Sequence, residues 1–151
     1  MIKILFVCHG NICRSVMAQY MMQDLVDRAG TAGQYVIDSA AMTTEEIGNA
    51  IYPPARRKLE EKGVPIGTHR ARLITRADCA DFDLLIGMDG ENMRMLHTVA
   101  GSKYADKCFR LLEFAGETGA ISDPWYTRDF ERAYQDILRG VKGLVEYCKG
   151  R

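Results

Sequence analysis

The chain has 151 residues, of which 47% are hydrophobic and 26% are charged. A chain of this size can bury a substantial core, so residues 1–151 are expected to form a single domain. Its twenty basic and twenty acidic residues cancel each other. This balance leaves no broad field to attract nucleic acid or an anionic membrane, and neither is expected as a partner.

The cysteines and the hydropathy pattern indicate the cellular setting. The sequence has neither a charged-then-apolar leader nor a long apolar span, which predicts a soluble protein in the cytoplasm. Five cysteines, an odd number without the spacing of a disulfide scaffold, suit that reducing compartment. No Cys-x2-Cys pair or Cys/His quartet is present, so neither a metal nor another cofactor is expected.

Strand and helix signals alternate along the chain. Short apolar runs predict the strands, and helical periodicity or helix-favouring composition predicts the segments between them. In chain order we expect a strand at 2–7, a helix at 16–29, a strand at 35–38, a helix at 55–62, a strand at 83–88, a helix at 91–99, a strand at 108–114 and a helix at 129–149. This alternation is typical of a doubly wound, Rossmann-like α/β fold, with a four-stranded parallel sheet covered by helices on both faces.

The segment after the first strand combines a thiol with the features of an anion-binding loop. Residues 8–15 read Cys-His-Gly-Asn-Ile-Cys-Arg-Ser. Gly10 and Asn11 tolerate the positive φ of a tight loop, so successive N–H groups can turn inward around an anion. The start of the following helix adds positive potential. The expected phosphate-binding residues are therefore His9, Gly10, Asn11, Ile12, Cys13 and Arg14.

The spacing of Cys8 and Arg14 adds chemistry to this loop. Five residues separate them, which is enough chain to wrap a tetrahedral oxyanion. Arg14 can then fold back and grip two phosphoryl oxygens with its planar guanidinium, which Lys cannot do. Thiols beside cations or at helix N-termini ionise more readily than free cysteine, so Cys8 is expected to be a thiolate at neutral pH.

These residues resemble a known family, the low-molecular-weight protein tyrosine phosphatases. The family signature Val-Cys-x-Gly-Asn-Ile-Cys-Arg-Ser is matched from Val7 to Ser15. The resemblance extends over nearly the whole chain, through Asp38-Ser39-Ala40, Thr68-His69-x-Ala71-Arg72, Phe82-Asp83, Met88-Asp89 and Asp123-Pro124-Trp125-Tyr126. It implies the strand order 2-1-3-4, with the loop at the point where the winding reverses. It also implies hydrolysis of phosphotyrosine proteins or small aryl phosphates, with inorganic phosphate as product.

The resemblance also implies roles for individual residues. Cys8 would attack phosphorus to form a cysteinyl-phosphate, Arg14 and the loop amides would bind the phosphate, and Asp123 would act as general acid and then base. The Asp-Pro step disfavours helix at Asp123 and suits a carboxylate carried on a loop. Trp125 and Tyr126 would line the substrate crevice, although core aromatics beside the last helix are the alternative.

The opposite wall of the crevice departs from the family pattern. Many members offer an aromatic residue there, whereas the nearest residues in this chain are Glu45 and Glu46. Two carboxylates near the entrance should repel acidic peptides. We therefore expect a shift toward neutral or basic substrates.

A second group of residues is expected to support the loop. Asn11, Ser15, Ser39 and His69 match positions of a hydrogen-bond network in the family. Cys13 matches a second loop cysteine that can trap an oxidised nucleophile as a reversible disulfide. The alternatives are a His69 satisfied by the backbone and a Cys13 that only packs at the helix start.

Two other functions are compatible with the same loop. A thiol-dependent arsenate reductase of this fold needs two further cysteines after the third strand, and residues 88–92 contain none. A non-catalytic phosphotyrosine-binding module would have lost the thiol or the acid, and this chain has both Cys8 and Asp123. The physiological substrate stays open, and either a monomer or a weak dimer is expected.

Overall fold

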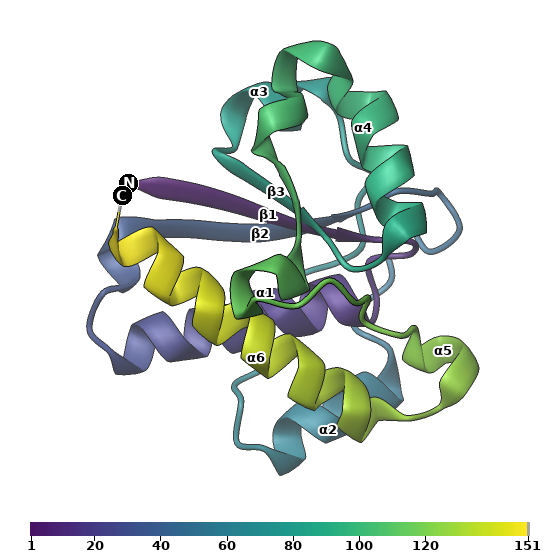
Figure 1. The fold of residues 1–151 in the computed structure, drawn as a ribbon. Helices are drawn as coiled ribbons and strands as arrows, with labels where there is room; N and C mark the ends of the chain where they lie inside the picture. The colour runs from purple at the N-terminus through teal and green to yellow at the C-terminus, as the bar shows by residue number, and fades with distance from the viewer. Residues whose placement is uncertain (151) are drawn as a thin grey trace.

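A four-stranded parallel sheet lies at the centre of the computed structural model, which describes residues 1–150 (Figure 1). Its strands are β1 (Ile2–Cys8), β2 (Tyr35–Ala41), β3 (Leu84–Gly87) and β4 (Cys108–Arg110). They lie in the order β2-β1-β3-β4, which confirms the expected order. The expected domain range ends at Arg151, which lies outside the described residues.

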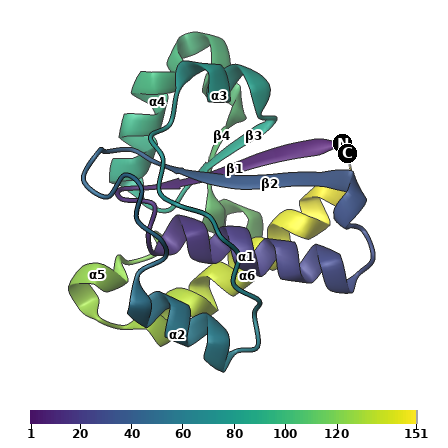
Figure 2. The ribbon, with the colours of Figure 1, turned by 180° about the vertical axis from the view of Figure 1, so that it is seen from behind.

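Helices cover both faces of the sheet (Figures 1 and 2). The α-helices are α1 (Arg14–Arg28), α2 (Pro53–Glu61), α3 (Arg76–Asp81), α4 (Gly90–Tyr104), α5 (Pro124–Thr127) and α6 (Phe130–Lys149). The short 3-10 helices are η1 (Ala32–Gln34), η2 (Ala105–Lys107) and η3 (Leu111–Ala115). Helices α1, α2 and α6 lie on one face, α3 and α4 lie on the other, and α5 lies near the carboxyl end of β1. The two-sided cover confirms the doubly wound α/β fold.

Strand β1 is buried on both faces and contributes to two separate cores. Ile4, Phe6 and Cys8 belong to the core under α1 and α6. Leu5 and Val7 belong to the core under α3 and α4. A central parallel strand with both faces covered is expected to be a continuous apolar run, as this one is. Cys8 is the last residue of that strand, and its side chain lies on the α1 side.

The prediction of a strand over residues 108–114 was wrong beyond Arg110. Leu111–Ala115 form η3 instead. Helix α6 packs against η3 at two glycines: a Cβ on Gly140 would lie 2.5 Å from Leu111 Cγ, and one on Gly143 would overlap the Phe114 carbonyl. The apolar content of this segment cannot by itself reveal that its backbone packs directly against a helix.

Several element boundaries also differ from the predictions. Helix α1 begins at Arg14, which puts this residue in the first turn, and β2 continues to Ala41. The predictions missed α3 and α5 altogether. Helix α3 begins with a capping box between Thr75 and Asp78, a signal that the sequence contains. Helix α5 has only four residues, too few to show a helical period.

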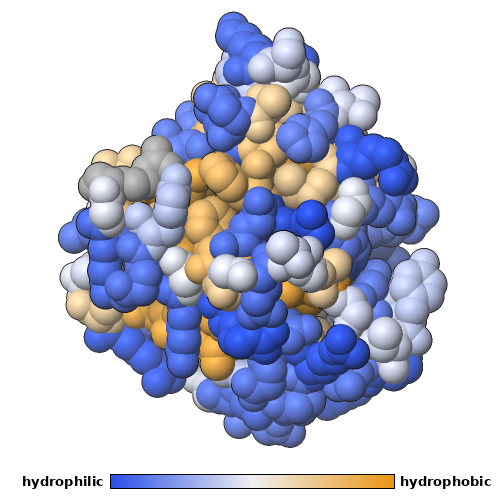
Figure 3. Space-filling view, viewed as in Figure 1, coloured by the Kyte–Doolittle hydropathy of each residue, from blue (hydrophilic) through white to orange (hydrophobic). Residues whose placement is uncertain are grey.

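The face of the molecule seen in Figure 3 is mostly hydrophilic, and an apolar area shows where α6 passes the sheet. Among residues 1–150, no helix combines the length and the apolar character that crossing a bilayer requires. Two exposed aromatic residues, Trp125 and Tyr126, lie on α5 beside the carboxyl end of the sheet.

Candidate active site

The loop after β1 lies at the point where the winding of the sheet reverses. Strand β1 pairs with β2 on one side and with β3 on the other, so the connections leave in opposite directions. In open α/β sheets, ligands bind at the carboxyl ends of the strands next to such a point. Strand β1 places Cys8 at the base of the loop, and α1 begins at Arg14.

Cys8 lies at the bottom of a small pocket and is 3% exposed. Its Sγ lies 3.0 Å from Ser15 Oγ. The pocket has a volume of about 100 Å³. It is lined by Cys8, His9, Gly10, Ile12, Cys13, Arg14, Glu45, Glu46, Asp123, Trp125 and Tyr126. All the predicted catalytic and crevice residues therefore meet in one pocket.

Arg14 is 2% exposed and is oriented by oxygen acceptors. Its Nη1 donates to Asp89 Oδ2 and to the Ile121 carbonyl, each at 2.7 Å, and its Nη2 lies 3.4 Å from Asp123 Oδ2. Burial lowers the pKa of this guanidinium, but the negative charges of Cys8, Asp123 and Asp89 outweigh burial and raise it. A buried cation needs such partners, and here they fix the guanidinium beside the pocket.

Asp123 is the N-cap residue of α5, and its carboxylate has two distinct contacts. Oδ1 accepts a hydrogen bond from the Trp125 N–H at 3.0 Å. Oδ2 lies toward Arg14. The backbone of Asp123 is extended, with φ −81° and ψ 111°, as expected before Pro124. One oxygen is anchored by the backbone of its own helix, so the carboxylate lies at the pocket in a defined orientation.

Asn11 has a left-handed backbone with φ 60°, and its side-chain amide is fully paired. Nδ2 donates to Ser15 Oγ at 2.8 Å and to Ser39 Oγ at 2.9 Å. Oδ1 accepts from His69 Nε2 at 2.7 Å and from the Arg72 N–H at 3.3 Å. The structure therefore brings the four expected support residues into one network and holds the loop at its left-handed residue.

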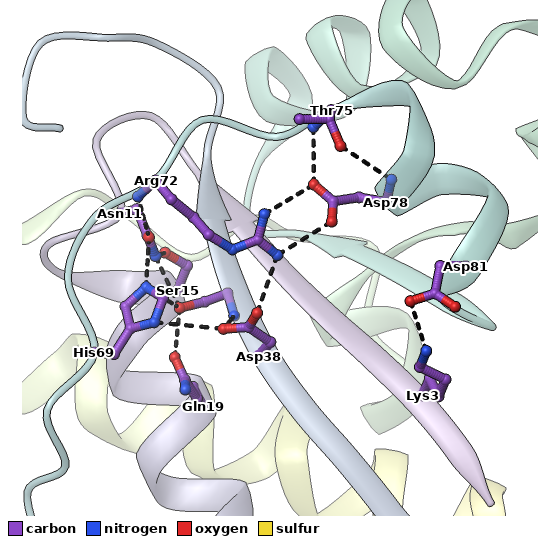
Figure 4. A network of polar contacts seen from close by, with 11 residues as sticks. Lys3, Asn11, Ser15, Gln19, Asp38, His69, Arg72, Thr75, Asp78 and Asp81 are labelled. Atoms are coloured by element: carbon purple, nitrogen blue, oxygen red, sulfur yellow. Dashed lines mark hydrogen bonds and ion pairs between the residues drawn. The ribbon is translucent and has the colours of Figure 1, made fainter. Parts of the chain in front are cut away.

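Figure 4 shows that this network continues from His69 toward α3. His69 Nδ1 lies 3.4 Å from Asp38 Oδ1. Arg72 then joins Asp38, at 3.0 Å, to Asp78, at 2.9 Å. Burial lowers the pKa of His69; the attraction of Asp38 opposes this effect and the repulsion of Arg72 adds to it. Because Asn11 Oδ1 can only accept, the neutral ring carries its proton on Nε2.

Cys13 lies in the same pocket and is 5% exposed. Burial raises the pKa of its thiol, and the negative charges of Cys8 and Asp123 raise it further. The Cys13 thiol therefore keeps its proton at neutral pH, whereas a nucleophilic cysteine would have to be ionised. Neither Cys8 nor Cys13 is in a disulfide in this structure.

The entrance of the pocket has an aromatic side and an acidic side. Trp125 is 42% exposed and Tyr126 is 79% exposed, so neither is a core residue. On the acidic side, Glu45 Oε2 lies 2.9 Å from His9 Nε2. Glu46 lies over Gly10, where an added Cβ would be 3.3 Å from its Cγ. Glu45 and Glu46 therefore both line the pocket.

Two residues of the site escaped the sequence predictions. Asp89 orients Arg14. It lies two residues after the end of β3, at the same edge of the sheet as Cys8 at the end of β1, so its position after a buried strand was an available signal. Tyr52 packs against Trp125 with ring centroids 4.7 Å apart. It lies at the end of a long loop, where the sequence gives no such signal.

The fold and the pocket define a class: an α/β protein that can hold a tetrahedral oxyanion over a thiol, with an arginine and a carboxylate beside it. Within residues 1–150, no group of three or more His, Cys, Asp or Glu side chains is arranged to hold a metal ion.

Comparisons with known proteins identify the family. The family model described as low molecular weight phosphotyrosine protein phosphatase matches residues 3–150. The low molecular weight protein-tyrosine-phosphatase YfkJ of Bacillus subtilis is 37% identical over 147 residues, which cover 96% of this chain and 94% of the relative. The low molecular weight phosphotyrosine protein phosphatase of Rattus norvegicus is 37% identical over 151 residues, with coverages of 95% and 94%.

Structural similarity leads to the same family. The crystal structure of YfkJ from Bacillus subtilis matches this structure with a TM-score of 0.96 and 36% identity, over 99% of this chain and 96% of that chain. The chain therefore belongs to the low molecular weight phosphotyrosine protein phosphatase family. It is a hydrolase of the protein-tyrosine-phosphatase type.

Proposed function

We propose that this protein hydrolyses phosphotyrosine and aryl phosphates through a cysteinyl-phosphate on Cys8. The observation that carries this is the meeting of Cys8, Arg14 and Asp123 in one pocket of about 100 Å³. In the first step, the thiolate attacks phosphorus, the bond from phosphorus to the phenolic oxygen breaks, and protonated Asp123 gives that oxygen its proton. In the second step, Asp123 takes a proton from water as the water oxygen attacks phosphorus and the bond from phosphorus to Cys8 Sγ breaks. Inorganic phosphate leaves and the thiolate is restored.

The surrounding groups support this chemistry electrostatically. Arg14, oriented by Asp89, would bind two of the three equatorial phosphoryl oxygens while the loop amides bind phosphoryl oxygens from the other side. Asn11 Nδ2 donates to Ser15 Oγ, so the Ser15 hydroxyl proton is available to Cys8 Sγ at 3.0 Å. A hydrogen bond to the thiolate stabilises its ionised form and makes it a better leaving group in the second step.

Substitutions at two residues test the mechanism. Cys8→Ser is expected to abolish turnover of p-nitrophenyl phosphate, because the serine hydroxyl stays protonated. For phenyl phosphate, whose leaving group needs a proton, Asp123→Ala is expected to lower kcat/KM by about 100-fold or more, the usual contribution of general acid catalysis. The parent should keep its activity in a chelator. Turnover by Cys8→Ser at the parent rate would exclude the cysteinyl-phosphate route.

The acidic side of the entrance supports a substrate preference. Glu45 and Glu46 line the pocket, and only Glu45 lies within hydrogen-bond distance of His9. Of two phosphotyrosine peptides that differ only in flanking charge, we expect the basic one to have a kcat/KM about threefold to tenfold higher, which corresponds to roughly 1 kcal/mol of surface electrostatics.

The control for this preference keeps the shape of the entrance. Glu45→Gln together with Glu46→Gln should bring the two kcat/KM values together, whereas Glu91→Gln, on exposed α4 surface, should leave their ratio unchanged. A parent enzyme that prefers the acidic peptide would refute the role of these glutamates.

A further inference from the structure

We propose that Arg128 is a positioning residue for the general acid, an inference that rests on the proposed role of Asp123. Its guanidinium contacts Tyr52 and Trp125, and we call these three residues the clasp. The clasp holds α5 against the rest of the pocket wall. Through Trp125 the clasp fixes the orientation of the Asp123 carboxylate.

The backbone of Arg128 is the first observation. It follows α5 directly and is left-handed, with φ 61° and ψ 13°. Glycine adopts this conformation without strain, and asparagine tolerates it better than other residues. Within residues 1–150, Asn11 is the other non-glycine residue with positive φ, and it belongs to the phosphate loop. A bulky residue held in such a conformation beside a functional site calls for a role of its side chain.

The side chain of Arg128 supplies that role. Its Nη1 donates to Tyr52 Oη at 3.1 Å and lies 3.4 Å from the Trp125 carbonyl oxygen. The guanidinium carbon lies 5.6 Å from the centroid of the Tyr52 ring, within the range of a cation–π contact. The Tyr52 ring in turn packs on the Trp125 ring with an interplanar angle of 49°. Arg128 therefore contacts the Tyr52 side chain and the Trp125 main chain, and the Tyr52 and Trp125 rings contact each other.

The clasp joins the two segments that carry the proposed chemistry. On one side, the Tyr52 N–H donates to the Ile12 carbonyl of the phosphate loop at 2.8 Å. On the other side, the Trp125 N–H donates to Asp123 Oδ1 at 3.0 Å. A displacement of Trp125 would therefore displace the hydrogen bond that orients the acid. The distance between the acid and the phosphate loop is set through this contact.

Arg128→Asn tests the clasp, because asparagine keeps the left-handed backbone and removes the guanidinium. Phenolate is a poor leaving group that needs the acid's proton, whereas p-nitrophenolate leaves with much less help. General acid catalysis contributes about 100-fold or more, so a misplaced acid should lower kcat/KM for phenyl phosphate about fivefold or more. The loss for p-nitrophenyl phosphate should be less than about twofold, and Tm should not fall.

Matched variants separate positioning from general stability. Tyr52→Ala should cause the same selective loss, and combining it with Arg128→Asn should add little, because both break one clasp. Arg132→Ala removes an exposed arginine near the start of α6 and should leave the ratio of the two substrates unchanged. An Arg128→Asn enzyme whose two kcat/KM values are unchanged, or fall equally, would overturn the clasp. A parent enzyme inactive on both substrates would instead overturn the proposed function.

Discussion

His69 is an imidazole whose two ring nitrogens both lie toward oxygen atoms. Nε2 donates to Asn11 Oδ1 at 2.7 Å, and Nδ1 lies 3.4 Å from an Asp38 carboxylate oxygen. In the neutral ring only Nε2 carries a proton, so only the first contact is a hydrogen bond. Burial lowers the pKa of His69 from its ordinary value near 6.5, so the neutral ring is the form that the folded network holds.

This pKa shift makes stability depend on pH. As pH falls below about 6.5, His69 takes up a proton in the unfolded chain but not yet in the folded protein. The unfolded state then binds more protons than the folded state, so the free energy of unfolding decreases as the pH is lowered. Urea unfolding between pH 7.5 and about 5 should show this decrease in the parent, and a smaller one in His69→Gln. Equal pH slopes in the two proteins would contradict the assigned shift.

Cys13 bears on how the site responds to oxidation. Its thiol is protonated because burial raises its pKa, so attack on an oxidised Cys8 requires removal of that proton. If Cys13 forms the protective disulfide, the parent should recover its activity in thiol reductant after peroxide treatment, and Cys13→Ser should recover markedly less. Cys108→Ser, which removes a cysteine from β4, is the control. Equal recovery of Cys13→Ser and the parent would exclude the protective role.

At the scale of elements, the contact of α6 with η3 depends on two glycines in the middle of a helix. Glycine weakens a helix interior by about 1 kcal/mol relative to alanine. Glycine is needed at Gly140 and Gly143 because η3 lies so close to α6 that a Cβ at either position would clash with it. The close approach lets α6 pack against Leu111 and Phe114.

Gly143→Ala should therefore destabilise the protein despite the better helix former. The added methyl group would overlap the Phe114 carbonyl, and overpacking of this kind costs about 1 to 3 kcal/mol. Urea unfolding at pH 7 would measure the difference. Gly33→Ala is the matched control, because nothing lies within 4 Å of an added Cβ there. An unchanged free energy of unfolding in Gly143→Ala would show that α6 and η3 can move apart freely.

The elements also show what the sequence could reveal. Strand β1 and the loop after it were predictable, because their apolar run, glycine and Cys-to-Arg spacing are all local. The end of β4 was not, because it depends on α6, which contacts η3 from about 30 residues further along the chain. Asp89 and Tyr52 act through partners 75 and 76 residues away, Arg14 and Arg128, so local patterns could not pair them.

At the scale of the whole molecule, the strand order brings four distant segments to one pocket. The loop at 8–14, the acidic side at 45–46, Asp89 and the segment at 123–126 all lie at the carboxyl ends of the strands. The protein has no net charge. Attraction for an anion therefore comes from this one end, where the loop amides, the start of α1 and Arg14 converge.

The most direct test of the account is to trap the covalent intermediate. A phosphotyrosine peptide is mixed with the protein, the reaction is quenched in acid after milliseconds, and the phosphorylated residue is located by mass spectrometry. We expect phosphate on Cys8 in the parent, none in Cys8→Ser, and more in Asp123→Asn if the second step becomes the slower one. Parent turnover with no phosphate on Cys8 at any quench time would contradict the cysteinyl-phosphate mechanism.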